Sequence, residues 1–182
     1  MDEQLPRGTT TFPDLVTVHF DGACEPARGG GVATYGFTVE GFGLEYEEKG
    51  LAVRPWSPRA TNNVAEYTAA IRALEWLTTR GFKGRVLMFG DSQLIVRQMK
   101  GEYEVKAPHL QEYHRHLRQL AGRFEEVRFE WVPRRENARA DALSKLAFAE
   151  SATSAGHRRP ESPVDPVEED LIPENDVRES ET

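Results

Sequence analysis

The sequence predicts an α/β fold in which a five-stranded mixed sheet is flanked by helices. Three observations lead to this prediction. Short apolar segments alternate with a period of two residues, which is typical of strands. Longer segments repeat apolar side chains every three or four residues, as helices do. Three strand segments come first, before helices and strands begin to alternate. Consecutive strands form antiparallel hairpins and helical crossovers join parallel strands, so we expect a mixed sheet in the order β-β-β-α-β-α-α-β-α.

The strands are predicted from apolar alternation between glycine and proline breaks. In the first strand Val16, Val18 and Phe20 share one face. A run of three glycines at 29–31 separates this strand from the second. We expect strands at residues 15–20, 32–39, 43–53, 85–89 and 127–132.

The helices are predicted from the longer period and from their end signals. In the longest helix Ala70, Ala73, Leu74 and Leu77 form one apolar stripe, and Gly81 follows the helix as a stop signal. We expect helices at residues 63–79, from 91 onward, at 108–121 and at 137–149.

The chain divides into three parts by composition. Residues 1–13 are expected to be a flexible lead-in, and residues 14–150 to form one domain that holds all the periodic apolar patterning. Residues 151–182 are expected to be a disordered acidic tail. The chain carries a net charge of −7, of which the tail, with nine acidic and three basic residues, contributes −6. The nearly neutral domain can therefore still present a basic groove. The tail fits solubility, masking of such a groove or docking of a partner.

Composition also disfavours several classes of protein. Nothing approaches the roughly 18 consecutive apolar residues of a membrane span. Residues 1–13 lack the basic-then-apolar pattern of a secretory signal. Cys24 is the single cysteine, so no intrachain disulfide can form. We therefore expect a cytoplasmic protein that does not contact a membrane.

Two aspartates follow predicted strands. Asp21 precedes Gly22 after the first strand, and Asp91 follows Gly90 after the fourth. Taken singly, Asp21 fits a turn and Asp91 fits a helix N-cap. If the two strands are parallel neighbours, however, both carboxylates emerge at one sheet edge, with the strands about 4.8 Å apart. Two anions that close repel each other unless a cation lies between them.

Two further carboxylates lie on predicted helices. Glu66 shares the apolar stripe of the longest helix, where desolvation of an unpartnered carboxylate is costly. A solvated glutamate in the first helical turn is the alternative, and the pattern leaves both interpretations open. Asp141 lies opposite the stripe of Leu143 and Leu146 on the last helix, so periodicity alone predicts a solvated side chain.

Four sequence blocks resemble the type 1 ribonuclease H family. They are FDGAC at 20–24, TNNVAE at 61–66, GDSQL at 90–94 and ENARADAL at 136–143. One short block would be weak evidence, but four blocks in the family's order, each at a predicted strand or helix end, are specific. The resemblance covers residues 15–148 and implies a ribonuclease H-like fold, whose element order matches the pattern above.

The resemblance implies an endonuclease that hydrolyses the RNA strand of RNA–DNA hybrids and leaves 5′-phosphate and 3′-hydroxyl ends. It also implies that Asp21, Glu66, Asp91 and Asp141 hold two Mg²⁺ ions, with Mn²⁺ able to substitute. Magnesium prefers carboxylate and water oxygens. Two such ions can activate the attacking water and stabilise the leaving oxygen.

Substrate-binding residues are implied by the same resemblance. RNA is distinguished from DNA by contacts to the 2′-hydroxyl. Helix capping remains open for the asparagines, and Cys24 fits a small strand-end residue rather than a reactive thiol. The implied contacts to RNA are Cys24, Arg28, Asn63, Glu66 and Gln93, and those to the DNA strand are Thr61 and Asn62.

The sequence departs from many bacterial family members in two places. The loop before the last helix, residues 132–137, lacks their histidine, and residues 100–110 are too short for their basic protrusion. Both features are similar to archaeal-type members. In this loop Arg134 and Arg135 fit phosphate contacts as well as solvated arginines. We expect modest, salt-sensitive affinity for the hybrid.

We expect a monomer that binds RNA–DNA hybrid nucleic acid and has no protein partner. One alternative is a catalytically weak hybrid-binding module, although four carboxylates would repel the phosphates of its ligand. Another is a nuclease of the same fold that cuts double-stranded RNA or serves a polymerase. Metal dependence and a comparison of substrates would separate these alternatives.

Overall fold

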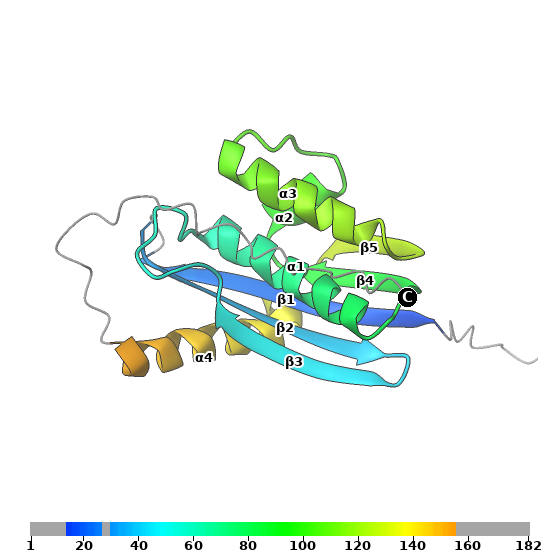
Figure 1. The fold of residues 1–182 in the computed structure, drawn as a ribbon, viewed down its shortest axis with the longest axis horizontal. Helices are drawn as coiled ribbons and strands as arrows, with labels where there is room; N and C mark the ends of the chain where they lie inside the picture. Colours follow the sequence, from blue (N-terminus) through cyan, green and yellow to red (C-terminus); the bar gives the residue numbers. More distant parts are fainter. Residues whose placement is uncertain (1–13, 27–29, 156–182) are drawn as a thin grey trace, which may run out of the picture.

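The computed structural model describes residues 14–26 and 30–155 of the 182-residue chain. The predictions for residues 1–13, for Arg28 and for residues 156–182 therefore lie outside the described residues. The elements follow the predicted order (Figure 1). They are β1 (Leu15–Glu25), β2 (Val32–Gly41), β3 (Leu44–Leu51), α1 (Asn62–Thr79), β4 (Arg85–Gly90), α2 (Gln93–Met99), α3 (Pro108–Ala121), β5 (Glu126–Trp131), the short 3-10 helix η1 (Arg134–Asn137) and α4 (Ala138–Ala155).

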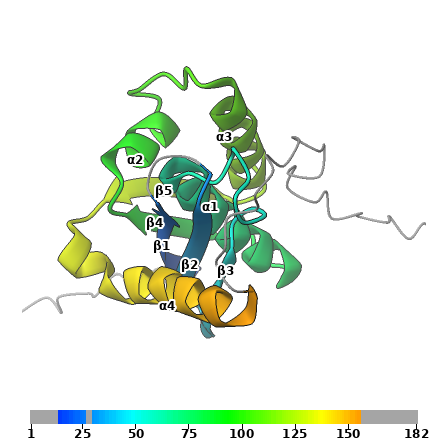
Figure 2. The same cartoon turned by 90° about the vertical axis from the view of Figure 1, so that its left-hand side faces the viewer.

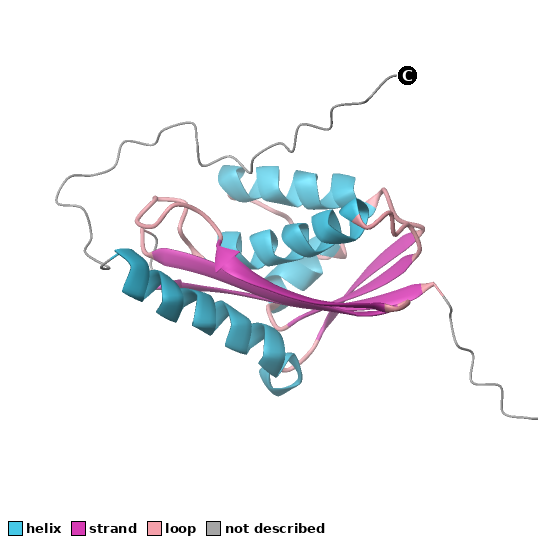
Figure 3. Cartoon of the chain, turned by 60° about the horizontal axis from the view of Figure 1, so that its bottom comes forward, coloured by secondary structure: helices cyan, strands magenta, loops and turns pink. Residues whose placement is uncertain are grey.

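The five strands form one mixed sheet in the order β3-β2-β1-β4-β5, as predicted. The first three strands pair antiparallel, whereas β4 pairs parallel with both β1 and β5. Helix α4 packs across β1, β2 and β3 on one face. Helices α1, α2 and α3 lie on the other side, with α1 against β1 and β2 (Figures 2 and 3). The sheet is thus a layer between two helical layers.

The core lies mainly between the sheet and α1. Val16, Val18 and Phe20 are fully buried, which confirms the predicted face of β1. Residues 32–39 of β2 are all buried, because helices cover this strand on both faces. Removal of these apolar side chains from water is the main force that stabilises the layers. None of the helices in residues 14–26 and 30–155 is both long and apolar enough to cross a membrane.

Two local interpretations from the sequence were wrong. Strand β1 does not stop at Phe20, because Asp21 pairs with Gly36 of β2 and the ladder continues to Glu25. Asp21 is therefore a strand residue and not a turn residue. The N-cap of α2 is Ser92, whose hydroxyl accepts the N–H of Ile95 at 3.4 Å, so Asp91 does not cap that helix.

Helix α4 also differs from the prediction. It continues to Ala155, beyond the expected end near residue 149. Leu146, assigned to the packed stripe, is 45% exposed, whereas Ala140, Ser144 and Ala147 are buried along with Leu143. Leu143 was therefore assigned correctly and Leu146 was not, because the small residues that complete the packed face carry little hydrophobic signal. The packed face includes the side on which Asp141 lies.

Gly36 sets the distance between α4 and the sheet. A Cβ atom at Gly36 would lie 2.6 Å from Cβ of Leu143 and 2.7 Å from the backbone nitrogen of Ser144. No other residue leaves room for so close a helix. The contact fixes α4 relative to β2 and, through it, relative to β1.

We expect Gly36→Ala to lower the free energy of unfolding by about 1–3 kcal/mol, because the added methyl group forces α4 away from β2. Gly122→Ala is the matched control, since Gly122 has φ −65° and its Cβ would make only ordinary contacts, the nearest at 3.4 Å. The control should be neutral or slightly stabilising. Urea unfolding measures both variants, and equal stability of the two would contradict the close-approach argument.

Candidate metal and active site

The parallel pairing of β1 with β4 brings two aspartates together. The register matches Phe20 with Gly90, so Asp21 and Asp91 are the next residues on two adjacent parallel strands. This is the arrangement on which the sequence argument depended, and the structure confirms it. Both side chains emerge at the carboxyl end of the parallel strands, where open α/β sheets usually bind ligands.

Glu66 reaches the same place from α1. Its apolar stripe is buried as predicted, and Glu66 itself is only 7% exposed. The position depends on Gly22, because a Cβ there would lie 2.2 Å from the backbone nitrogen of Glu66. The carboxylate oxygen Oε2 of Glu66 is buried and has no hydrogen-bond partner among the described residues. Of the two interpretations left open by the sequence, Glu66 is therefore the desolvated carboxylate and not the solvated glutamate of a first helical turn.

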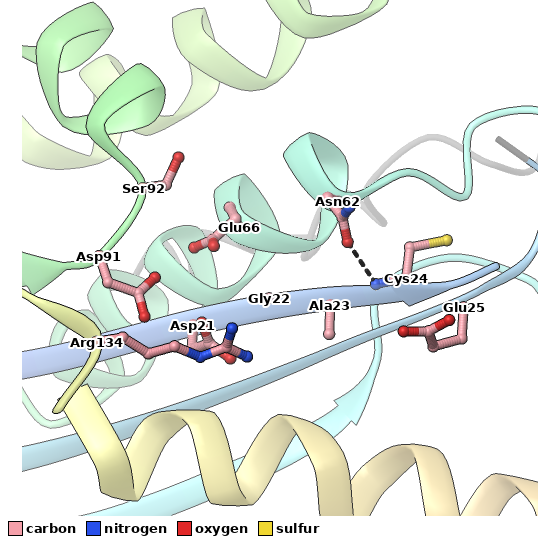
Figure 4. A pocket seen from close by; sticks show the side chains of 10 residues that line it. All are labelled: Asp21, Gly22, Ala23, Cys24, Glu25, Asn62, Glu66, Asp91, Ser92 and Arg134. Carbon is pink, nitrogen blue, oxygen red and sulfur yellow. Dashed lines mark hydrogen bonds between the residues drawn. The ribbon is translucent and has the colours of Figure 1, made fainter. Parts of the chain in front are cut away.

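The three carboxylates form one cluster. Asp21, Glu66 and Asp91 each offer an oxygen atom, and these atoms lie within 4.8 Å of one another. The three side chains point toward one another (Figure 4), and they line an open pocket of about 450 Å³. The residues that line this pocket are Asp21, Gly22, Ala23, Cys24, Glu25, Asn62, Glu66, Asp91, Ser92 and Arg134.

Burial raises the pKa of each carboxylate in the cluster. Burial, opposed by a hydrogen bond from Ser144 and reinforced by the charges of Asp91 and Asp141, raises the pKa of Asp21 to about 7. Burial and then the charges of Asp21 and Asp91 raise the pKa of Glu66 well above its usual value. Burial also raises the pKa of Asp91, although nearby Arg134 opposes the shift. The ionised cluster is therefore unfavourable without a cation.

Asp141 lies beside this cluster and has a different environment. Its Oδ1 accepts a hydrogen bond from Arg134 Nη2 at 2.9 Å, and its Oδ2 accepts one from Lys145 Nζ at 2.7 Å. Burial raises the pKa of Asp141, but these two cations outweigh burial and hold the pKa below its ordinary value. The side chain is only 16% exposed, so the prediction of a solvated aspartate was wrong.

The backbone around the cluster is held by β5 and η1. The indole N–H of Trp131 donates to the carbonyl oxygen of Asp91 at 3.1 Å. The buried amide of Asn137 donates through Nδ2 to the carbonyl oxygen of Phe20 at 2.9 Å. These bonds fix the backbone beside Asp21 and at Asp91.

The remaining predicted site residues separate into two groups. Cys24, Asn62 and Arg134 line the pocket, and Asn62 Oδ1 accepts the backbone N–H of Cys24 at 2.7 Å. Thr61 is the N-cap of α1, so the cap is this threonine and neither asparagine. The predicted substrate-binding residues outside the pocket lining are Thr61, Asn63, Gln93 and Arg135.

Sequence reasoning missed two polar residues behind the cluster. Ser144 is fully buried on α4 and donates to Asp21 Oδ2 at 2.6 Å. Asn137 is 1% exposed; it belongs to the block at 136–143 that resembles the family, but it had been assigned no role in the site. A signal for Ser144 was present, because it lies three residues after Asp141 on the same helix. It was lost because the packed face had been assigned to the leucines.

Comparisons with known proteins agree with this arrangement. A family model described as "Reverse transcriptase-like" matches residues 49–147. Ribonuclease HI of Halobacterium salinarum is 38% identical over 135 residues, which cover 73% of this chain and 64% of that protein. The bifunctional protein Rv2228c of Mycobacterium tuberculosis is 43% identical over 98 residues, which cover 53% of this chain. That match spans only 26% of the mycobacterial protein.

Solved structures extend the likeness to the whole fold. The N-terminal RNase H domain of Rv2228c from Mycobacterium tuberculosis is 34% identical with a TM-score of 0.67, over 78% of this chain and 98% of that one. LC11-RNase H1, solved in complex with an RNA/DNA hybrid, is 34% identical with a TM-score of 0.65, over 75% of this chain and 98% of that one. The fold and the carboxylate cluster thus define a ribonuclease H-like domain. The chain belongs to the type 1 ribonuclease H family and is similar to its archaeal members.

The raised pKa of Asp21 predicts how stability depends on pH without divalent metal. In the unfolded chain this carboxyl titrates near 3.8, and in the folded protein near 7. Between these values the folded state binds more protons, so the free energy of unfolding falls as pH rises from about 4 to about 7. Asp21→Asn removes the titrating group. In EDTA it should therefore be more stable than the parent protein at pH 8, by about 1 kcal/mol or more.

Thermal unfolding at pH 5 and pH 8 in EDTA measures this effect. The stability gain of Asp21→Asn should shrink at pH 5, where the parent carboxyl is already protonated. Glu104→Gln, which changes an exposed carboxylate, is the control and should leave stability unchanged at both pH values. A gain that is equal at pH 5 and pH 8 would show that Asp21 is not the titrating group.

Proposed function

We propose that this chain is a ribonuclease H that hydrolyses the RNA strand of RNA–DNA hybrids and leaves 5′-phosphate and 3′-hydroxyl ends. One observation carries the proposal: Asp21, Glu66 and Asp91 meet within 4.8 Å at the carboxyl edge of a ribonuclease H-like sheet. We propose that residues 14–150 form the nuclease domain, that it acts as a cytoplasmic monomer and that it needs no protein partner.

The donor set fits divalent metal ions. Carboxylate oxygens are the ligands that Mg²⁺ prefers, and Glu66 Oε2 is buried with no partner among the described residues. We propose that Asp21, Glu66, Asp91 and Asp141 hold two Mg²⁺ ions, for which Mn²⁺ can substitute. Asp141 would bind a metal ion in place of the ammonium group of Lys145 or the guanidinium group of Arg134, which it now contacts. Bound ions would neutralise charge at the reacting phosphate and favour ionisation of the attacking water.

The chain's own side chains orient the substrate. Asp21, Asp91 and Arg134 lie toward one end of the pocket, and Asn62 and Cys24 toward the other (Figure 4). Arg134 is 70% exposed, which suits contact with a phosphate at the acidic end. Asn62 uses Oδ1 to accept the N–H of Cys24, which leaves Nδ2 to donate to nucleic acid. At this polar end, the proposal assigns a contact with the RNA 2′-hydroxyl to Cys24 and a contact with the DNA strand to Asn62.

Cleavage of a labelled RNA–DNA hybrid tests the proposal. RNA should be cut in Mg²⁺ and spared in EDTA, and Asp91→Asn should lower the rate more than about a hundredfold. Glu104→Gln should cut like the parent protein. Double-stranded RNA and double-stranded DNA serve as the comparison substrates.

The ends of the products give a second measurement in the same assay. Poly(A) polymerase should extend the 5′ fragments directly, because they end in a 3′-hydroxyl. Hybrid binding without cutting in Mg²⁺ would favour a binding module instead, and preferential cutting of double-stranded RNA would change the substrate class.

The two loop arginines can be told apart by the salt dependence of binding. Arg134 lines the pocket and Arg135 does not. The logarithm of the binding constant falls as log salt rises. We therefore expect Arg134→Gln to make this slope less steep by about one, and Arg135→Gln to leave it unchanged. Hybrid binding is measured in the Asp91→Asn background, which keeps the RNA intact. If both variants kept the slope of the parent protein, both arginines would be assigned to solvent.

A further inference from the structure

We propose that Ser144 is a positioning residue that orients the carboxylate of Asp21 toward a divalent cation. This inference rests on the proposed function, because it assumes that Asp21 is a metal ligand. Ser144 lies on α4, is fully buried and does not line the pocket, and its hydroxyl donates to Asp21 Oδ2 at 2.6 Å. Figure 4 shows α4 running alongside β1 at this position.

The hydroxyl of Ser144 has two acceptors within reach. Besides Asp21, it lies 2.9 Å from the carbonyl oxygen of Asp141, one turn earlier in the helix. A hydroxyl carries a single proton. The carboxylate offers the shorter contact and the stronger, charged acceptor, so it takes the greater share of that proton. The bond engages one oxygen of Asp21 and leaves the other for a ligand in the pocket.

The position of Ser144 is set by the backbone around it. Gly36 allows the backbone nitrogen of Ser144 to come so close that a Cβ at that glycine would lie 2.7 Å from it. Thr34 Oγ1 donates to the carbonyl oxygen of Ser144 at 2.8 Å, in a buried bond from β2. Ser144 is 0% exposed and has little room to turn elsewhere. The hydroxyl is therefore aimed at Asp21 by the packing of α4 on the sheet.

This bond is not needed to hold α4 in place. Asn137, just before α4, binds the Phe20 carbonyl, Thr34 binds the carbonyl of Ser144, and Arg139 pairs with Glu47 at 2.6 Å. An alanine at position 144 would keep these contacts and nearly the same volume. What the hydroxyl adds is a link between Asp21 on β1 and the helix that carries Asp141. The geometry therefore couples two of the four proposed metal ligands through one side chain.

Mn²⁺ binding to the full chain without nucleic acid tests the role of Ser144. Titration calorimetry, or the electron paramagnetic resonance signal of free Mn²⁺, gives the Kd. We expect Ser144→Ala to weaken Mn²⁺ binding roughly tenfold, as loss of an outer-shell hydrogen bond to a ligand usually does. Thr34→Val is the matched control, because it removes the other buried hydrogen bond between the sheet and Ser144 but leaves the hydroxyl and the close approach at Gly36 that positions it. It should change the Kd less than about twofold, although both variants lose some thermal stability.

A double variant separates orientation of Asp21 from a general effect on the helix. If Ser144 acts through Asp21, Ser144→Ala should not weaken Mn²⁺ binding further in the Asp21→Asn background. An unchanged Kd for Ser144→Ala, or an equal loss in Thr34→Val, would overturn the role of Ser144 and leave the proposed function intact. Failure of the parent protein to bind Mn²⁺ at all would overturn the proposed function, and the inference with it.

Discussion

The structure depends on three carboxylates, two buried and one half-buried, that are held together beside an open pocket. Burial disfavours the ionised form of each of these side chains, and the charges of neighbouring carboxylates add to this effect. The hydrogen bond from Ser144 to Asp21 and the positive charge of Arg134 lower these pKa values, but they offset the raise only in part. Such an arrangement lowers the stability of the metal-free fold. It becomes favourable when a divalent cation supplies the missing charge.

The fold creates this arrangement by backbone geometry more than by side-chain contacts. Parallel pairing of β1 with β4 puts the two aspartates side by side. Gly22 then lets α1 approach β1, which brings Glu66 into the cluster, and Gly36 lets α4 approach β2, which brings up Ser144 and Asp141. Each ligand thus comes from a different element, and the two helices α1 and α4 are held by close contacts that tolerate no side chain. Small movements of either helix would change the distances between ligands.

Much of this could be predicted from the sequence. The spacing of apolar residues predicted the order of strands and helices. The position of Glu66 on an apolar stripe indicated a desolvated carboxylate. Asp21 and Asp91 were misinterpreted singly, because Asp-Gly and Gly-Asp are ordinary turn and cap signals whose meaning changes only once β1 and β4 are paired. Ser144 and the inward side of α4 were missed because alanine and serine carry too weak a hydrophobic signal to outweigh two leucines. Contacts between distant elements, such as Thr34 with Ser144, leave no local pattern.

The central claim is that the carboxylate cluster exists to hold a cation. Anomalous diffraction from crystals of the protein grown with Mn²⁺ tests this most directly, because it locates the ion without reference to activity. We expect an anomalous peak between Asp21, Glu66 and Asp91. The ion should contact Glu66 Oε2, the oxygen that has no partner among the described residues. Well-ordered carboxylates with no peak between them, at a Mn²⁺ concentration that saturates binding in solution, would contradict it.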